Sequence, residues 1–209
     1  ASSAVGFRNK AASENASAIG YGNNANALAA SAVGYNNTAG GVGSSTIGYN
    51  NTATNENASA FGYGNTAGGL ASSAFGFSNT ASGDNANAFG YNNIASGSKS
   101  NVFGTGNTVS GSSSTAVGTA NEVAAENSTA IGNNNTISSG AENSAALGNN
   151  ISISLKDSVA LGNNSTATAI NSVTGNSSYT KWAGVSDVVG VVSVGSSGAT
   201  RQILSLIHI

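Results

Sequence analysis

The chain of 209 residues lacks cysteine, proline and methionine, and only 7% of its residues are charged. The absence of cysteine leaves the redox compartment open, because cytosolic and bacterial surface proteins can both avoid this residue. A net charge of −2 gives no electrostatic reason to expect a nucleic-acid partner. No run approaches the roughly 18 apolar residues of a membrane-spanning helix, and no secretory signal opens the chain.

Large side chains are also scarce, which argues against an ordinary globular core. Hydrophobic residues make up 39% of the chain, but much of that share is alanine, and glycine contributes 29 residues. A disordered acidic or basic segment is disfavoured, since such segments are rich in charge and poor in apolar residues. The chain begins inside a repeat, at Ala1-Ser2-Ser3-Ala4-Val5-Gly6. We therefore expect it to be a piece of a longer protein.

The dominant feature is a repeated dyad of an apolar residue followed by glycine. We number the apolar residue 0 and the glycine +1. The dyad recurs every 14 residues up to Ile131-Gly132, then after 16 at Leu147-Gly148 and after another 14 at Leu161-Gly162. The position-0 residues are Val5, Ile19, Val33, Ile47, Phe61, Phe75, Phe89, Phe103, Val117, Ile131, Leu147 and Leu161. Twelve copies at a nearly fixed period predict a solenoid.

Within each copy the pattern is that of a short strand. Position −1 is mostly alanine, and position +2 is aromatic in the first seven copies, from Phe7 to Tyr91, before it becomes threonine or asparagine. Side chains alternate between the two faces of a strand, so positions 0 and +2 share one face while −1 and +1 share the other. One face therefore carries large residues and the other only small ones, and a helix is disfavoured by the recurring glycine.

Position +4 is asparagine in ten successive copies. Asparagine tolerates left-handed backbone angles and caps turns, and identical asparagines stacked at one corner of a coil can form a hydrogen-bonded ladder. The ladder predicted here contains Asn9, Asn23, Asn37, Asn51, Asn65, Asn79, Asn93, Asn107, Asn121 and Asn135. Position +6 is always small or apolar, which suits a second short strand with one buried residue.

Two strands and two turns fit 14 residues, so each coil advances by one strand spacing, about 4.8 Å. We expect so thin a coil to enclose only alanine, glycine, serine and asparagine. The position-0 residues then form an exposed apolar row that a soluble monomer does not tolerate. The row therefore predicts that several copies pack about a common axis.

These features resemble the head domain of the YadA-like trimeric autotransporter adhesins. The matching motifs include Ser17-Ala18-Ile19-Gly20, Ser31-Ala32-Val33-Gly34 and Thr129-Ala130-Ile131-Gly132, and the resemblance covers about residues 1–170. It implies a left-handed parallel β-roll, all-β and homotrimeric, with position 0 as the trimer-interface row facing the threefold axis. The family often has valine at position −2, where most copies here have serine, threonine or asparagine. The aromatic residue at +2 could supply that missing apolar volume, and the altered face leaves collagen binding in doubt.

The resemblance also divides the chain. Residues 1–170 form the repeats, and residues 171–203 resemble the segment with which such heads enter their neck. Trp182 fits a cap on the last coil better than a ligand site. We expect residues 204–209, which contain the only histidine, to be a non-native tail, since they resemble the translated end of a sequencing transposon.

Catalysis finds no support in the sequence. The carboxylates fall mostly between repeats, where corners project into solvent. Glu122 and Glu126 are close in sequence but have no His, Ser or Cys partner with which to form a catalytic set. No cofactor or metal site is expected.

The sequence and the resemblance together predict a non-enzymatic adhesive head on the bacterial cell surface. It would be held by an outer-membrane anchor absent from this sequence. Expected partners are two further copies of the chain and matrix proteins (collagen, fibronectin, laminin), other cells or abiotic surfaces.

Two alternatives stay open. The first is a structural spacer without a ligand of its own. The second is an ice-binding solenoid, which would need one outward row of threonine; threonine is expected to be scattered here.

Overall fold

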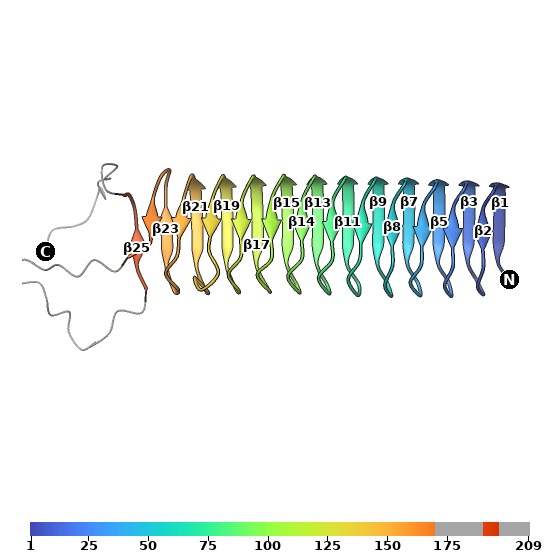
Figure 1. Cartoon of the computed structure of the whole chain (residues 1–209), viewed down its shortest axis with the longest axis horizontal. Coiled ribbons are helices and arrows are strands. Elements are labelled where there is room, and N and C mark those ends of the chain that lie inside the picture. Colours follow the sequence, from blue (N-terminus) through green and yellow to red (C-terminus); the bar gives the residue numbers. More distant parts are fainter. Residues whose placement is uncertain (170–189, 197–209) are drawn as a thin grey trace, which may run out of the picture.

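A computed structural model describes residues 1–169 and 190–196 as an all-β solenoid of stacked parallel coils (Figure 1). The prediction of a parallel solenoid with 14-residue coils is confirmed. Each coil contributes a longer strand to one sheet and a two-residue strand to another, so the two sheets run side by side along the rod.

The first sheet carries the glycine dyads. Its strands, in spatial order, are β1 (Ser3–Phe7), β3 (Ser17–Tyr21), β5 (Ser31–Tyr35), β7 (Ser45–Tyr49), β9 (Ser59–Tyr63), β11 (Ser73–Phe77), β13 (Asn87–Tyr91), β15 (Asn101–Thr105), β17 (Thr115–Thr119), β19 (Thr129–Asn133), β21 (Ala145–Asn149), β23 (Val159–Leu161) and β25 (Val192–Ser193).

The second sheet is narrower and contains positions +5 and +6. Its strands, in spatial order, are β2 (Lys10–Ala11), β4 (Asn24–Ala25), β6 (Thr38–Ala39), β8 (Thr52–Ala53), β10 (Thr66–Ala67), β12 (Thr80–Ala81), β14 (Ile94–Ala95), β16 (Thr108–Val109), β18 (Glu122–Val123), β20 (Thr136–Ile137), β22 (Ser152–Ile153) and β24 (Thr166–Ala167).

Equivalent positions of successive coils lie opposite one another. In β5 and β7, for example, Val33 pairs with Ile47 and Gly34 with Gly48. The register survives the 16-residue coil, where β19 still places Ile131 opposite Leu147. The two extra residues are therefore absorbed in the turn between β20 and β21, where Gly140 has φ 90°.

Residues 190–196 lie within the expected transition to the neck. There β25 pairs with β23 and places Val192 opposite Val159, so this segment adds one more strand to the first sheet. The rest of the expected transition, including Trp182, and the expected non-native tail lie outside the described residues.

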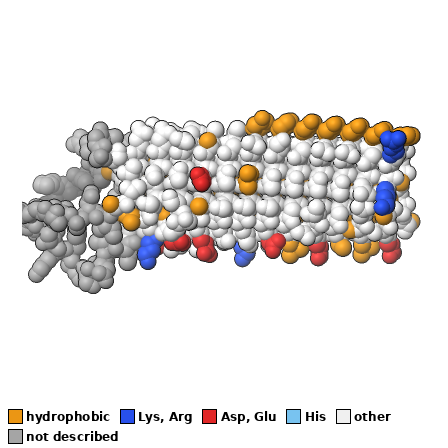
Figure 2. Space-filling view, in the orientation of Figure 1, with side chains coloured by type: hydrophobic (Ala, Val, Ile, Leu, Met, Phe, Trp, Pro, Cys, Tyr) orange, Lys and Arg blue, Asp and Glu red, His pale blue; other side chains and the backbone are white. Residues whose placement is uncertain are grey.

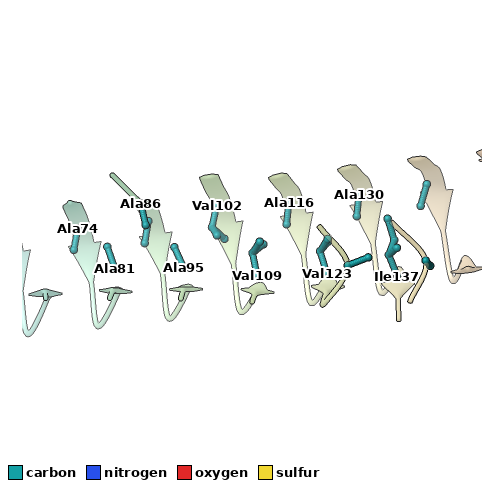
Figure 3. Close-up of a cluster of buried hydrophobic side chains, with 14 of the residues drawn as sticks. Ala74, Ala81, Ala86, Ala95, Val102, Val109, Ala116, Val123, Ala130 and Ile137 are labelled. Carbon is teal, nitrogen blue, oxygen red and sulfur yellow. The ribbon is translucent and has the colours of Figure 1, made fainter. Parts of the chain in front are cut away.

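The interior is built from alanine in the N-terminal coils. Ala60 and Ala67, at positions −1 and +6 of one coil, are fully buried, as the alternation of faces predicts. The expectation that only small residues fit inside is wrong for the later coils, where larger side chains are buried. Figure 3 shows several of them in the places that alanine occupies earlier. The ones labelled there are Val102, Val109, Val123 and Ile137. Two further isoleucines are buried: Ile153 at position +6, and Ile151 at position +4, where earlier copies have asparagine.

Apart from the dyad glycine at +1, the residues with positive φ in each 14-residue coil lie at positions +3 and +10. Asn36 has φ 53° and Asn57 has φ 56°. The asparagine at +4 is therefore not itself the left-handed residue. Asn37 follows the corner and is fully buried, and its side chain caps the turn by donating to the Val33 carbonyl at 3.0 Å. Several residue types occupy position +3, including Arg8, Ser78 and Ala120.

Glycine at position +1 serves the backbone and not the interior packing. Gly34 has φ +120°, and a Cβ built on it would lie 2.1 Å from the carbonyl oxygen of Gly48 in the next coil. The expectation that this glycine simply completes a face of small interior residues is therefore incomplete. The close approach of neighbouring coils excludes any side chain here.

The +4 asparagines form a hydrogen-bonded column inside the roll. The Asn65 side-chain amide donates to the Oδ1 of Asn51 at 3.0 Å, to the carbonyl of Phe61 at 2.9 Å and to that of Gly76 at 2.7 Å. The Oδ1 of Asn65 accepts from both the backbone and the side-chain nitrogen of Asn79. Each buried amide therefore links three consecutive coils.

The close approach at glycine predicts the effect of Gly34→Ala. We expect it to lower the free energy of unfolding by about 3–5 kcal/mol, because it combines left-handed strain with a backbone clash. The control is Gly106→Ala: Gly106 has φ +64° with nothing within 4 Å of its built Cβ. That change should cost only about 1 kcal/mol. Urea unfolding followed by circular dichroism measures both, and equal effects would contradict the backbone explanation.

The asparagine column predicts a similar loss for Asn65→Leu. This change removes the bonds to Phe61 and Gly76 and leaves buried polar groups unpaired, so we expect a loss of about 3–5 kcal/mol. The control Asn36→Gly removes one exposed amide bond to Asn50 and keeps a residue suited to positive φ. It should cost less than about 1 kcal/mol. If both variants unfold at the same urea concentration, the column is not what holds the coils together.

Candidate assembly and binding surfaces

The position-0 residues form a continuous row on the outer face of the first sheet. Eight of the twelve are between 38% and 58% exposed, and Val33, Phe61, Phe75 and Phe89 are half-buried. The rings from Phe61 to Phe103 stack with centroids 4.7–5.3 Å apart. Along the described coils, a band of large apolar side chains therefore lies open to solvent in a single chain.

A second apolar feature, the aromatic ridge, runs along one edge of the roll. It consists of the seven position-+2 residues Phe7, Tyr21, Tyr35, Tyr49, Tyr63, Phe77 and Tyr91. Neighbouring rings stack at 4.8–5.4 Å between centroids. Figure 2 shows the ridge standing out along the N-terminal half. Because the ring faces pack on one another, the ridge presents ring edges and hydroxyl groups to solvent.

Beyond Tyr91 the same edge becomes polar. Position +2 is Thr105 and Thr119, and then a short amide ladder in which Asn133 donates to Asn149 at 2.8 Å and Asn149 donates to Asn163 at 2.9 Å. The stacking of equivalent positions is therefore kept while the chemistry of the edge changes.

The opposite edge contains position +9 of each 14-residue coil and the equivalent Glu142 of the 16-residue coil, and we call it the charged edge. Its residues are Glu14, Leu28, Val42, Glu56, Leu70, Asp84, Ser98, Ser112, Glu126, Glu142 and Lys156. Figure 2 shows the alternation of acidic, basic and apolar side chains along this edge. Leu28, Val42 and Leu70 are each more than two-fifths exposed.

Carboxylates elsewhere in the described residues are also surface groups. Glu122 is exposed on β18 and Asp157 lies at a left-handed corner, while Asp187 lies outside the described residues. Within residues 1–169 and 190–196, no three His, Cys, Asp or Glu side chains come together as a possible metal site.

The outer face of the second sheet carries a column of threonine at position +5. Thr38, Thr52, Thr66 and Thr80 pair in register on successive strands. The expectation that threonine is scattered is therefore wrong, and the signal was its 14-residue spacing from one coil to the next. Ile94 and Glu122 interrupt the column, so it forms no continuous threonine face.

The residues singled out from the sequence thus fall into two groups. The asparagine column lies inside, where Asn23 to Asn135 are at most 1% exposed, so it is not accessible to a ligand. The position-0 row lies outside, beside the aromatic ridge. Among the described residues, no helix could cross a membrane.

Comparison with known proteins agrees with this architecture. A model of the family described as the YadA head domain repeat (2 copies) matches residues 1–23, 11–37, 39–65, 67–93, 110–135 and 156–173, which together make up more than half of the chain. A search among curated proteins found no match. The fold is that of a structural, adhesin-type domain, and the chain belongs to the YadA head family of trimeric autotransporter adhesins.

Proposed function

We propose that this chain is the adhesive head of a surface-anchored trimeric autotransporter of a Gram-negative bacterium. It would attach the cell to host extracellular matrix, other cells or abiotic surfaces. The family assignment is the observation that carries this role, and the exposed position-0 row supports the assembly of several copies. The anchor in the outer membrane would be supplied outside this sequence.

The row favours assembly on energetic grounds. Burying what remains exposed of each large side chain contributes roughly 1 kcal/mol, so twelve of them contribute on the order of 10 kcal/mol per copy. Because the row is straight and runs the length of the repeats, parallel copies around a common axis bury all of it at once. Three copies is the number that the family suggests.

Such an assembly leaves the second sheet and its threonine column facing solvent. This surface is polar and repeats from coil to coil, so a ligand would meet many equivalent contacts. Weak contacts repeated along the rod, and again on each copy, give avidity without any single dominant residue.

The assembly is tested by the mass of the folded chain in light scattering, which should be that of three copies. We expect Phe75→Glu/Phe89→Glu to shift the mass towards one copy, because two charges in the row would be buried without partners. Thr80→Glu on the second sheet is the control, since Glu122 already occupies that column. A monomeric unmodified chain would refute the assembly.

Adhesion is tested by solid-phase binding of the assembled chain to collagen, fibronectin, laminin and plastic. At least one surface should retain it, and the dissociated Phe75→Glu/Phe89→Glu variant should bind at least tenfold more weakly through lost avidity. A blank result on every surface would instead support the alternative, a structural spacer within a longer surface fibre.

A further inference from the structure

The two edges of the roll lose their large apolar residues at about the same coil. The aromatic ridge spans the first seven coils, and the exposed Leu28, Val42 and Leu70 of the charged edge lie within those coils. From Ser98 onward the charged edge carries no large apolar residue, and from Thr105 onward the other edge is polar too. The aromatic ridge therefore spans the same coils as the exposed apolar residues of the charged edge.

The roll does not need this outer apolar volume for its own interior. In the ridge-bearing coils the interior positions hold fully buried alanine, such as Ala60 and Ala67. The ridge side chains remain between 38% and 59% exposed although they stack on one another. Their outward surface is therefore free for a partner.

In the first six coils the charges of the two edges have opposite signs, and Lys99, beside Ser98 in the seventh coil, is the exception. Arg8 lies at the ridge edge, with its Cζ 5.2 Å from the centre of the Phe7 ring. The charged edge carries Glu14 in the same coil, and Glu56 and Asp84 further along. Opposed edges of two copies would thus attract one another at the first coil.

We propose that the aromatic ridge of one copy packs against the charged edge of a neighbouring copy, with both chains parallel and in the same axial register. This inference rests on the assembly proposed above and specifies its contacts. Tyr35 of one copy would lie beside Val42 or Leu28 of the next, and Arg8 would lie beside Glu14.

Other arrangements fit the two edges less well. An antiparallel neighbour would set most of the ridge against Ser112, Glu126, Glu142 and Lys156, where the charged edge has no large apolar residue, and would leave Leu28, Val42 and Leu70 in water. Two ridges packed on each other would leave Leu28, Val42 and Leu70 in water. Contact between unlike edges also continues around a closed ring and so buries the position-0 row of every copy.

Cysteine cross-linking tests the contact on a chain that has no cysteine of its own. The variants are Tyr35→Cys/Val42→Cys, Tyr35→Cys/Leu28→Cys and the three single substitutions, each treated with an oxidant or a short bismaleimide. At least one double variant should form covalent dimers and closed rings on a denaturing gel, while the single variants stay as single chains. A link within one chain is excluded, because a five-residue strand of roughly 13 Å separates the two edges.

The matched control is Thr38→Cys/Val42→Cys, which moves one thiol to the outer face of the second sheet. It should remain a single chain on the gel. Dimers from Tyr35→Cys alone would show ridge against ridge and overturn the inference. Double variants that stay uncross-linked but keep a trimeric mass in light scattering would overturn the proposed edge contact and leave the trimeric assembly intact. A monomeric mass would overturn both the edge contact and the assembly.

Discussion

The stacking of each residue on its own equivalent in the next coil governs this molecule. The Asn65 amide bonds to Asn51 in the coil before and to the Gly76 carbonyl in the coil after, so one side chain fixes the spacing of three coils. At that spacing a Cβ at position +1 would strike the neighbouring carbonyl. Glycine and asparagine therefore recur together: glycine permits the approach, and the asparagine four positions from the dyad's apolar residue satisfies the carbonyl that the approach buries.

The same constraint turns every outward position into a linear array. Seven aromatic residues become a ridge, four threonines become a column, and Asn133, Asn149 and Asn163 become a ladder. The placement of large apolar residues also changes from the early coils to the later ones. Early coils combine an alanine interior with the aromatic ridge, whereas later coils bury residues such as Val109 and Ile137 and carry polar groups along the ridge edge. The later coils thus bury more apolar volume within a single chain, and the earlier coils gain more stability from contact with a neighbouring chain.

Much of this followed from the sequence, because identity at a fixed spacing is a strong signal. The dyad Val33-Gly34 predicted the coil, and alternation placed Ala32 inside and Val33 outside. The left-handed corner escaped notice because no single residue type marks it: Arg8, Asn36 and Ala120 all occupy it. Left-handed backbone costs only about 1–2 kcal/mol, which the surrounding coil can offset, so it imposes no uniform residue. The buried Val102 and Ile151 were missed because room inside a coil depends on the shape of the closed coil, which spacing does not report.

The repetition of equivalent residues also determines how the outer face of the second sheet can recognise a ligand. A ligand that touches the second sheet meets Thr38, then Thr52, then Thr66 at one strand spacing, so recognition depends on matching that period more than on any single side chain. Substitution at one coil removes one contact among many, and the residues that interrupt the column, such as Glu122, limit how far a regular ligand can extend. In the proposed assembly the position-0 row and the ridge are covered by neighbouring chains. The apolar surfaces then determine how copies associate, and the polar arrays on the outer face are left to meet the ligand.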